Sequence, residues 1–348
     1  MQSSVPDLLK ASSVKPAINS PVTHLNSLDG LRAIAALLVL FTHGLSAHLW
    51  TGYNVSSIGV AVFFSLSGFL MGYLYLEKKP DAQVIKNYLI SRFSRIAPAY
   101  LFTIIVAFVI YSYLDHEFIY KIDLHNLVRH LLFSGNVAVF WSIPPEVQFY
   151  VFFIFIWLAF FQYRQGSFNM IMLVAAVILL MLMVRNHVPG TTLPSKIHFF
   201  ALGCAAGVLR RKMAINATVL LNVLQAAAFL GLIIYGTYLV SVHDYRYPYA
   251  IFHYALLTAM TVFILSYQTG FTQCVLANKL LMAIGQWSFS LYLSHEAVMY
   301  FMTHYVHGLP RLLMAAGTVI LAIILSWLMY SLIEVPTQAA LKRRLTRK

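Results

Sequence analysis

Arg32 and His43 lie eleven residues apart in the first long apolar stretch of the chain. On an α-helix, eleven steps of about 1.5 Å and 100° place both side chains on one face, roughly 16 Å apart along the axis. Arginine keeps its charge and suits phosphate groups, whereas histidine exchanges a proton near neutral pH. The spacing predicts a helix face that binds an anion at one end and transfers protons at the other. The alternative is that Arg32 anchors the helix at a membrane surface and His43 is a hydrogen-bonded interior residue.

Arg92 and Arg95 are a second pair of cations, three residues apart, and they share one side of a helix if their segment is helical. Two guanidinium groups placed in this way bind a pair of phosphates well. The same charges also fit a plain anchor at the cytoplasmic surface. The spacing alone does not separate these two interpretations.

Glu146 follows two prolines at the predicted start of a helix, where the helix dipole favours a carboxylate. In the topology described below, Glu146 and Glu296 are the acidic residues within the membrane or at its outer part. A carboxylate there would meet the His43 imidazole across two helices, orient it and stabilise its protonated form. Glu146 is therefore either a partner of His43 or a helix-start residue.

Ser288, Tyr292 and His295 form a polar stripe, at positions i, i+4 and i+7, in an otherwise apolar stretch. Such a stripe must face protein or water rather than lipid. It either lines the cavity that holds His43 or makes hydrogen bonds between helices.

Ser65, Gly68 and Gly72 form a face of small residues in the second apolar stretch. Small side chains let two helices approach closely, so this face favours helix packing over ligand contact.

The elements that must position these residues are membrane helices. The chain has 348 residues, of which 60% are hydrophobic and 10% charged, whereas soluble domains have about 25% charged residues. The composition predicts an all-α polytopic membrane protein. The net charge of +13 is explained by topology, so no nucleic-acid partner is expected.

About ten apolar segments are long enough to cross roughly 30 Å of hydrocarbon. They cover residues 30–50, 55–76, 97–114, 145–163, 167–185, 196–211, 216–241, 249–268, 284–304 and 309–334. We expect a disordered cytoplasmic tail over residues 1–27, one transmembrane domain over 28–336, and a basic cytoplasmic tail over 337–348.

The basic residues between the segments test this topology. With the N-terminus in the cytoplasm, seventeen lysines and arginines face inside and six face outside, and Arg32 completes the 24. The positive-inside rule therefore predicts that both termini are cytoplasmic.

The cysteines and histidines predict neither a disulfide nor a metal site. Cys204 falls inside a predicted span and Cys274 in a cytoplasmic loop. The thirteen histidines are scattered, without a pair at metal-ligand spacing.

Five motifs in order resemble the integral-membrane acyltransferase-3 family. They are Leu28-Asp29-Gly30-Leu31-Arg32 followed by His43; Phe63-Phe64-Ser65-Leu66-Ser67-Gly68-Phe69; Arg92-Phe93-Ser94-Arg95-Ile96-Ala97-Pro98-Ala99-Tyr100; Trp141-Ser142 with Glu146 and Phe149-Tyr150; and Ser290-Leu291-Tyr292-Leu293-Ser294-His295. Many family members carry an acidic residue where this chain has Ala61, so a mechanism that needs a carboxylate there does not apply.

The resemblance implies a ten-helix enzyme of the bacterial cytoplasmic membrane. It would pass an acyl group, usually acetyl, from cytoplasmic acyl-coenzyme A, a co-substrate rather than a bound cofactor, to a hydroxyl of a surface polysaccharide, glycolipid or lipid-linked sugar precursor. Glycan-assembly proteins are possible partners. The chain stops before the extracellular esterase-like domain of some members, so this membrane protein is expected to complete the transfer or to pass the acyl group to a separate partner.

Roles follow residue by residue from the resemblance. The catalytic candidates are His43, Glu146 and His295. His43 would act as the general base, and in a variant of the mechanism a covalent acyl-enzyme forms. The donor-binding candidates are Arg32, Arg92, Arg95, Asp29 and Ser67. The acceptor-binding candidates are Trp141, Ser142, Tyr150 and Tyr292. The same polar residues would also fit a proton-coupled transporter of a small anion, or a receptor or scaffold with a structural polar core.

Overall fold

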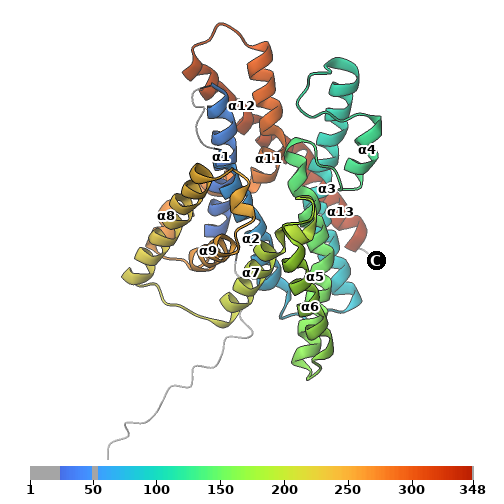
Figure 1. Cartoon of the computed structure of the whole chain (residues 1–348), viewed down its shortest axis with the longest axis vertical. Helices are drawn as coiled ribbons and strands as arrows, with labels where there is room; N and C mark the ends of the chain where they lie inside the picture. Colours follow the sequence, from blue (N-terminus) through green and yellow to red (C-terminus); the bar gives the residue numbers. More distant parts are fainter. Residues whose placement is uncertain (1–23, 49–53, 347–348) are drawn as a thin grey trace, which may run out of the picture.

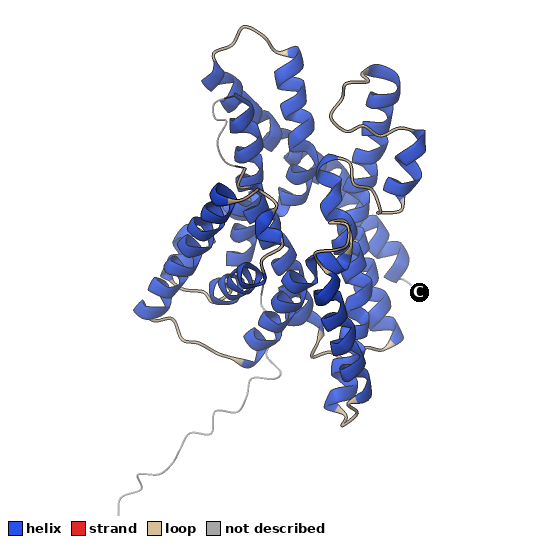
Figure 2. Ribbon diagram, in the orientation of Figure 1, coloured by secondary structure: helices blue, strands red, loops and turns tan. Residues whose placement is uncertain are grey.

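The computed structural model describes residues 24–48 and 54–346, and over these ranges the chain is helical without a β-strand (Figure 2). The all-α prediction is confirmed. The main helices are α1 (Asn26–His48), α2 (Ser56–Tyr75), α3 (Ala82–Val109), α4 (Leu124–Leu131), α5 (Ile143–Arg164), α6 (Asn169–Val184), α7 (Leu193–Lys212), α8 (Val219–Val242), α9 (Phe252–Leu265), α10 (Gly270–Val275), α11 (Lys279–Tyr305), α12 (Arg311–Met329) and α13 (Val335–Thr346).

Each of the ten predicted apolar segments falls on one of these helices. Within the described ranges, six helical stretches are long and apolar enough to cross a membrane. They are Asn26–Gly44, Ser56–Tyr75, Ala82–Leu114, Ala138–Arg164, Val219–Val242 and Arg311–Arg344. Helices α6 and α9 are apolar but shorter. The structure thus supports a multi-pass membrane protein, while the count of ten spans stays a prediction.

Helix α2 packs closely against α7 through glycines on both helices. A Cβ atom added to Gly68 would lie 2.2 Å from the Phe200 carbonyl oxygen, and one added to Gly203 would lie 2.2 Å from the Ser65 carbonyl oxygen. Gly72 is equally close to the Cys204 carbonyl oxygen. The predicted small-residue face of α2 is therefore a packing surface.

Helix α1 lies between α2 and α11. A Cβ atom on Gly59 of α2 would lie 2.3 Å from the Ala35 carbonyl oxygen, and one on Gly285 of α11 would lie 2.0 Å from the Asp29 carbonyl oxygen. In Figure 1, α11 and α12 form a hairpin that rises beside the upper end of α1. This packing brings the histidine-bearing part of α1 next to α11.

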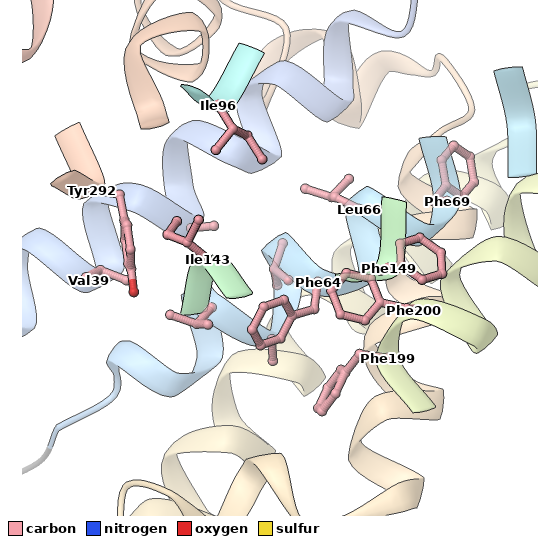
Figure 3. Packing of buried hydrophobic residues seen from close by; sticks show 14 of the residues in the cluster. Val39, Phe64, Leu66, Phe69, Ile96, Ile143, Phe149, Phe199, Phe200 and Tyr292 are labelled. Carbon is pink, nitrogen blue, oxygen red and sulfur yellow. The ribbon is translucent and has the colours of Figure 1, made fainter. Parts of the chain in front are cut away.

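An aromatic core joins α2, α5 and α7 (Figure 3). Phe149 of α5 stacks on Phe200 of α7, with ring centroids 4.4 Å apart. Phe64 of α2 lies 5.1 Å from Phe200 and 6.5 Å from Phe199. Because these rings are buried, they fix the start of α5 against α2 and α7.

The segment from 115 to 142 is folded onto the bundle. The Tyr120 hydroxyl donates to the Leu293 carbonyl of α11 at 2.8 Å, and the Tyr100 hydroxyl of α3 donates to the His130 carbonyl of α4 at 2.9 Å. A 3-10 turn, η2 (Ala138–Ser142), then leads into α5. These contacts hold the Trp141–Tyr150 region beside α11.

The two chain ends differ from the predicted domain bounds. Helix α1 begins at Asn26, two residues before the predicted domain, and residues 1–23 of the predicted tail lie outside the described residues. After α12 a π-helical turn, η4 (Tyr330–Glu334), runs directly into α13, which packs against α3. Most of the predicted basic tail is therefore helix. Its cytoplasmic location stays a prediction.

Candidate active site

One cavity lies where α1, α2, α3, α5 and α11 meet. Arg32 of α1 and Arg92 and Arg95 of α3 all line it, so the three predicted donor-binding arginines are brought together. Its other polar lining residues are Ser67, Ser142, Glu146, Tyr150, Ser288 and Tyr292. Part of the apolar wall is seen in Figure 3, where Phe64, Leu66, Ile96, Ile143 and Tyr292 are labelled.

The arginines of the cavity have few partners. Within the described ranges, Arg32 and Arg95 form no hydrogen bond, and no acidic group lies within 4.0 Å of either guanidinium. Arg92 donates only to the Ser91 hydroxyl, at 3.4 Å, and its Nε atom is buried without a partner. Arg95 acts electrostatically on the carboxyl groups of Asp29 and Glu334, but none of the three guanidinium groups has an acidic group within 4.0 Å among the described residues. The cavity is therefore electrostatically suited to an anionic ligand.

Glu146 lies in the first turn of α5 and faces the same cavity. The Ser67 hydroxyl and the Tyr150 hydroxyl both donate to its Oε1 atom, the latter at 2.6 Å. Tyr150 is itself held by its backbone carbonyl, which accepts from the Tyr88 hydroxyl at 2.8 Å. Glu146 therefore belongs to the arginine-lined cavity. The acidic residue beside His43 is Glu296 instead.

His43, His295 and Glu296 form a second polar group between α1 and α11. His295 Nδ1 lies 2.8 Å from the Tyr292 carbonyl oxygen, and its Nε2 lies 3.0 Å from His43 Nδ1. A neutral His295 that donates through Nδ1 accepts through Nε2, so the network assigns the hydrogen to Nδ1 of His43. Glu296 Oε1 lies 3.4 Å from that same nitrogen. The basic nitrogen of a neutral His43 is then Nε2.

Tyr292 connects the two polar groups. Its side chain lines the cavity, and its hydroxyl accepts from the Ser142 hydroxyl at 2.9 Å. Its ring lies 5.9 Å from the His295 ring. His43 and His295 are not among the cavity-lining residues, and His295 adjoins the cavity through its contact with Tyr292. The predicted stripe of Ser288, Tyr292 and His295 is thus divided: the first two line the cavity, and the third contacts His43.

Besides His43 and His295, two more predicted residues, Asp29 and Trp141, are not among the lining residues. Asp29 is close to His24, with Oδ2 and Nε2 3.2 Å apart. Trp141 packs edge-on against Phe64, which lines the cavity, with ring centroids 6.3 Å apart. Ala61, at the position where a carboxylate is common, is fully buried.

Sequence reasoning assigned no role to Glu296, although the signal was present. It is the only acidic residue of α11 and it directly follows His295. The ligand atoms of His43, His295 and Glu296 lie within 4.8 Å of one another, a set that could hold a metal ion. The prediction of no metal site used local spacing only, and these residues lie about 250 positions apart in the chain.

Comparison with known proteins places the chain among membrane acyltransferases. The model of the acyltransferase domain of the acyltransferase-3 family matches residues 25–331. A peptidoglycan O-acetyltransferase, OatA, of Listeria monocytogenes is 26% identical, over 89% of this chain and 55% of its own length. An O-acetyltransferase OatA of Staphylococcus aureus is 24% identical, over 90% of this chain and 57% of its own length. The chain therefore spans little more than half of these relatives.

No solved structure matches the chain.

Proposed function

The chain belongs to the acyltransferase-3 family, and from this premise we propose that it transfers an acetyl group from acyl-coenzyme A to a hydroxyl of a surface glycan or of its lipid-linked precursor. Two relatives are named as O-acetyltransferases, and these names support acetyl as the group that is transferred. The observation that carries the proposal is the cavity lined by three arginines and one carboxylate, in which the arginines form no ion pair within the part of the chain that the structure describes.

The donor would be held by Arg32, Arg92 and Arg95. Coenzyme A carries several phosphate charges, and guanidinium groups bind phosphate through two parallel hydrogen bonds. Helix α1 is continuous from Asn26 to His48, so the rise from Arg32 to His43 is about 16 Å. An extended pantetheine arm can cover such a distance. Phosphates at Arg32 would therefore leave the thioester near Tyr292 and His43.

The acceptor hydroxyl would lose its proton to Nε2 of His43. The hydroxyl oxygen attacks the thioester carbonyl carbon, the carbon–sulfur bond breaks, and the imidazolium returns its proton to the leaving thiolate. The products are an ester and free coenzyme A. His295 and Glu296 support this role because both lie against Nδ1 of His43, where they fix the ring and stabilise its protonated form.

Glu146 would act at the donor side of the cavity. Its Oε1 atom is held by the hydroxyls of Ser67 and Tyr150, whereas its Oε2 atom makes no hydrogen bond among the described residues. Beside three arginines, a single carboxylate keeps the cavity from binding anions indiscriminately and orients Tyr150. Among the described residues that line the cavity, Glu146 is the one with a carboxylate.

The proposal is tested by incubating purified protein with acetyl-coenzyme A labelled in the acetyl group. We expect release of free coenzyme A that depends on an added glycan acceptor, together with label in the glycan. A proton-coupled transporter of small anions would use the same cations without chemistry. Acetyl-coenzyme A that stays intact with every acceptor, while the protein carries an anion across vesicles, would favour the transporter.

A further inference from the structure

Lys196 is a buried cation that has no anionic partner among the described residues. It lies in the first turn of α7, its side chain is 6% exposed, and among the described residues it forms no hydrogen bond or ion pair. Its Nζ atom lies over two rings instead, 5.0 Å from the Tyr249 centroid and 5.7 Å from the Trp141 centroid. Ring faces stabilise an ammonium group only in part, so Lys196 retains capacity for an anion.

Arg185 and His198 lie near Lys196 and have polar atoms without a partner among the described residues. Lys196 lies over the Tyr249 ring, His198 contacts the Tyr249 carbonyl, and Arg185 contacts the carbonyl of the next residue, Ala250. Arg185 donates to the carbonyls of Leu182 and Ala250, but its Nε atom is buried without a partner. His198 contacts the Tyr249 carbonyl through Nε2 at 3.0 Å, and its Nδ1 atom is buried without a partner. We call Arg185, Lys196 and His198 the basic cluster.

The basic cluster adjoins the candidate active site through Trp141. The Trp141 ring touches Tyr249 edge-on at 5.3 Å and Phe64, which lines the cavity, at 6.3 Å. The next residue, Ser142, lines the cavity and donates to Tyr292. A molecule held at the basic cluster would therefore lie one aromatic side chain away from the lining of the cavity.

We infer that the basic cluster binds a carboxylate or phosphate of the acceptor, so that the glycan acetylated by this protein is an anionic one. Lys196 and Nε of Arg185 would donate to the anion. Trp141 and Tyr249 would pack on the adjoining sugar ring, as aromatic faces do. This inference rests on the proposed function and adds the chemical class of the acceptor.

The test compares an oligosaccharide of uronic acids with its neutral, carboxyl-reduced counterpart. Acetyl transfer by the full-length protein in neutral detergent is measured for the wild type, Lys196→Gln, Lys196→Arg and Lys121→Gln, the last an exposed lysine as control. We expect Lys196→Gln to raise KM for the uronic-acid acceptor about tenfold or more, with kcat and the neutral acceptor unaffected. Lys196→Arg should retain the preference, and Lys121→Gln should match the wild type.

Calorimetric binding of the same two oligosaccharides separates this inference from the proposed function. If no acceptor is acetylated but the uronic-acid oligosaccharide binds to the wild type and not to Lys196→Gln, the anion site stands and the transferase proposal fails. Equal effects of Lys196→Gln on both acceptors, or on neither, would overturn the inference. The inference would also be overturned if binding to vesicles rose with their phosphatidylglycerol content and did not depend on the uronic acid, because the cluster would then hold a lipid headgroup.

Discussion

Single residues decide which of the polar groups can carry out proton transfer. Nδ1 of His43 faces His295 and Glu296, and the proton transfer that we propose is assigned to the other ring nitrogen, Nε2. Glu146 is held by two hydroxyls in the cavity with the arginines. His43 and Glu146 therefore lie in different places, and substituting each residue separately distinguishes their contributions to acetyl transfer.

Replacing His43 with alanine should lower acetyl transfer by about 10²–10⁴-fold, the usual contribution of a positioned general base. Coenzyme A binding should not change, because the cations that would hold the phosphates remain. The measurement is single-turnover transfer by folded, membrane-inserted protein. His125→Ala, at an exposed position of α4, is the control. Full activity in His43→Ala would remove His43 from the mechanism and direct attention to Glu146.

His130 gives a prediction on pH and stability. It lies in the segment from 115 to 142, and burial lowers the pKa of its imidazole below 6.5. As the pH falls below 6.5, the unfolded chain binds a proton at this imidazole and the folded protein does not. The folded protein therefore loses stability as the pH falls from 6.5 to the lower pKa that His130 has in the folded state. Between pH 7.5 and 5, Tm should fall less in His130→Gln than in the wild type. If Tm changes with pH in the same way in the wild type and in His130→Gln, His130 does not contribute to the pH dependence of stability.

The sequence predicted the cationic residues of the site better than its acidic ones. Arg32, Arg92 and Arg95 stand out because fixed charges beside apolar helices need a polar environment. The place of Glu146 depends on η2 and on contacts such as that of Ser142 with Tyr292, which lie 150 residues apart. Local patterns carry no information on such contacts, so the sequence left open whether Glu146 contacts His43, whereas the structure has Glu296 in that position.

At the level of helices, close packing of α2 holds the cavity in shape. Its glycines let α7 approach until backbone atoms touch, and its other side carries Ser67 into the cavity. The helices themselves followed from apolar length, because their hydrogen bonds are local. The packing of α4 and of the segment 115–142 could not be predicted from the sequence, because it depends on distant partners such as Leu293.

Gly68→Ala should destabilise the protein, because the new Cβ would lie 2.2 Å from the Phe200 carbonyl oxygen. Overpacking of this kind typically costs about 1–3 kcal/mol. The matched control is Gly231→Ala in α8, where nothing lies within 4 Å of the new atom. That substitution should leave stability unchanged or raise it by up to about 1 kcal/mol. Thermal unfolding in detergent measures both, and equal Tm values would contradict the packing described for α2 and α7.

For the whole molecule, the asymmetry of basic residues predicts which loops face the cytoplasm. We expect Glu117→Cys and His307→Cys, in exposed loops, to react with a membrane-impermeant maleimide in intact cells. Ser167→Cys, between α5 and α6, should react only after permeabilisation. All three are made in a Cys274→Ser background, because Cys274 is exposed and Cys204 is buried. Labelling of Ser167→Cys in intact cells would overturn the predicted orientation.

The proposed function depends on an arginine-lined cavity that receives coenzyme A, and direct binding of coenzyme A to the purified protein tests it. We predict saturable binding that weakens as salt rises, and that weakens about tenfold or more in Arg95→Gln. Arg311→Gln, an exposed arginine at the start of α12, should bind as the wild type does. Absence of binding, or equal affinity in Arg95→Gln, would contradict the account.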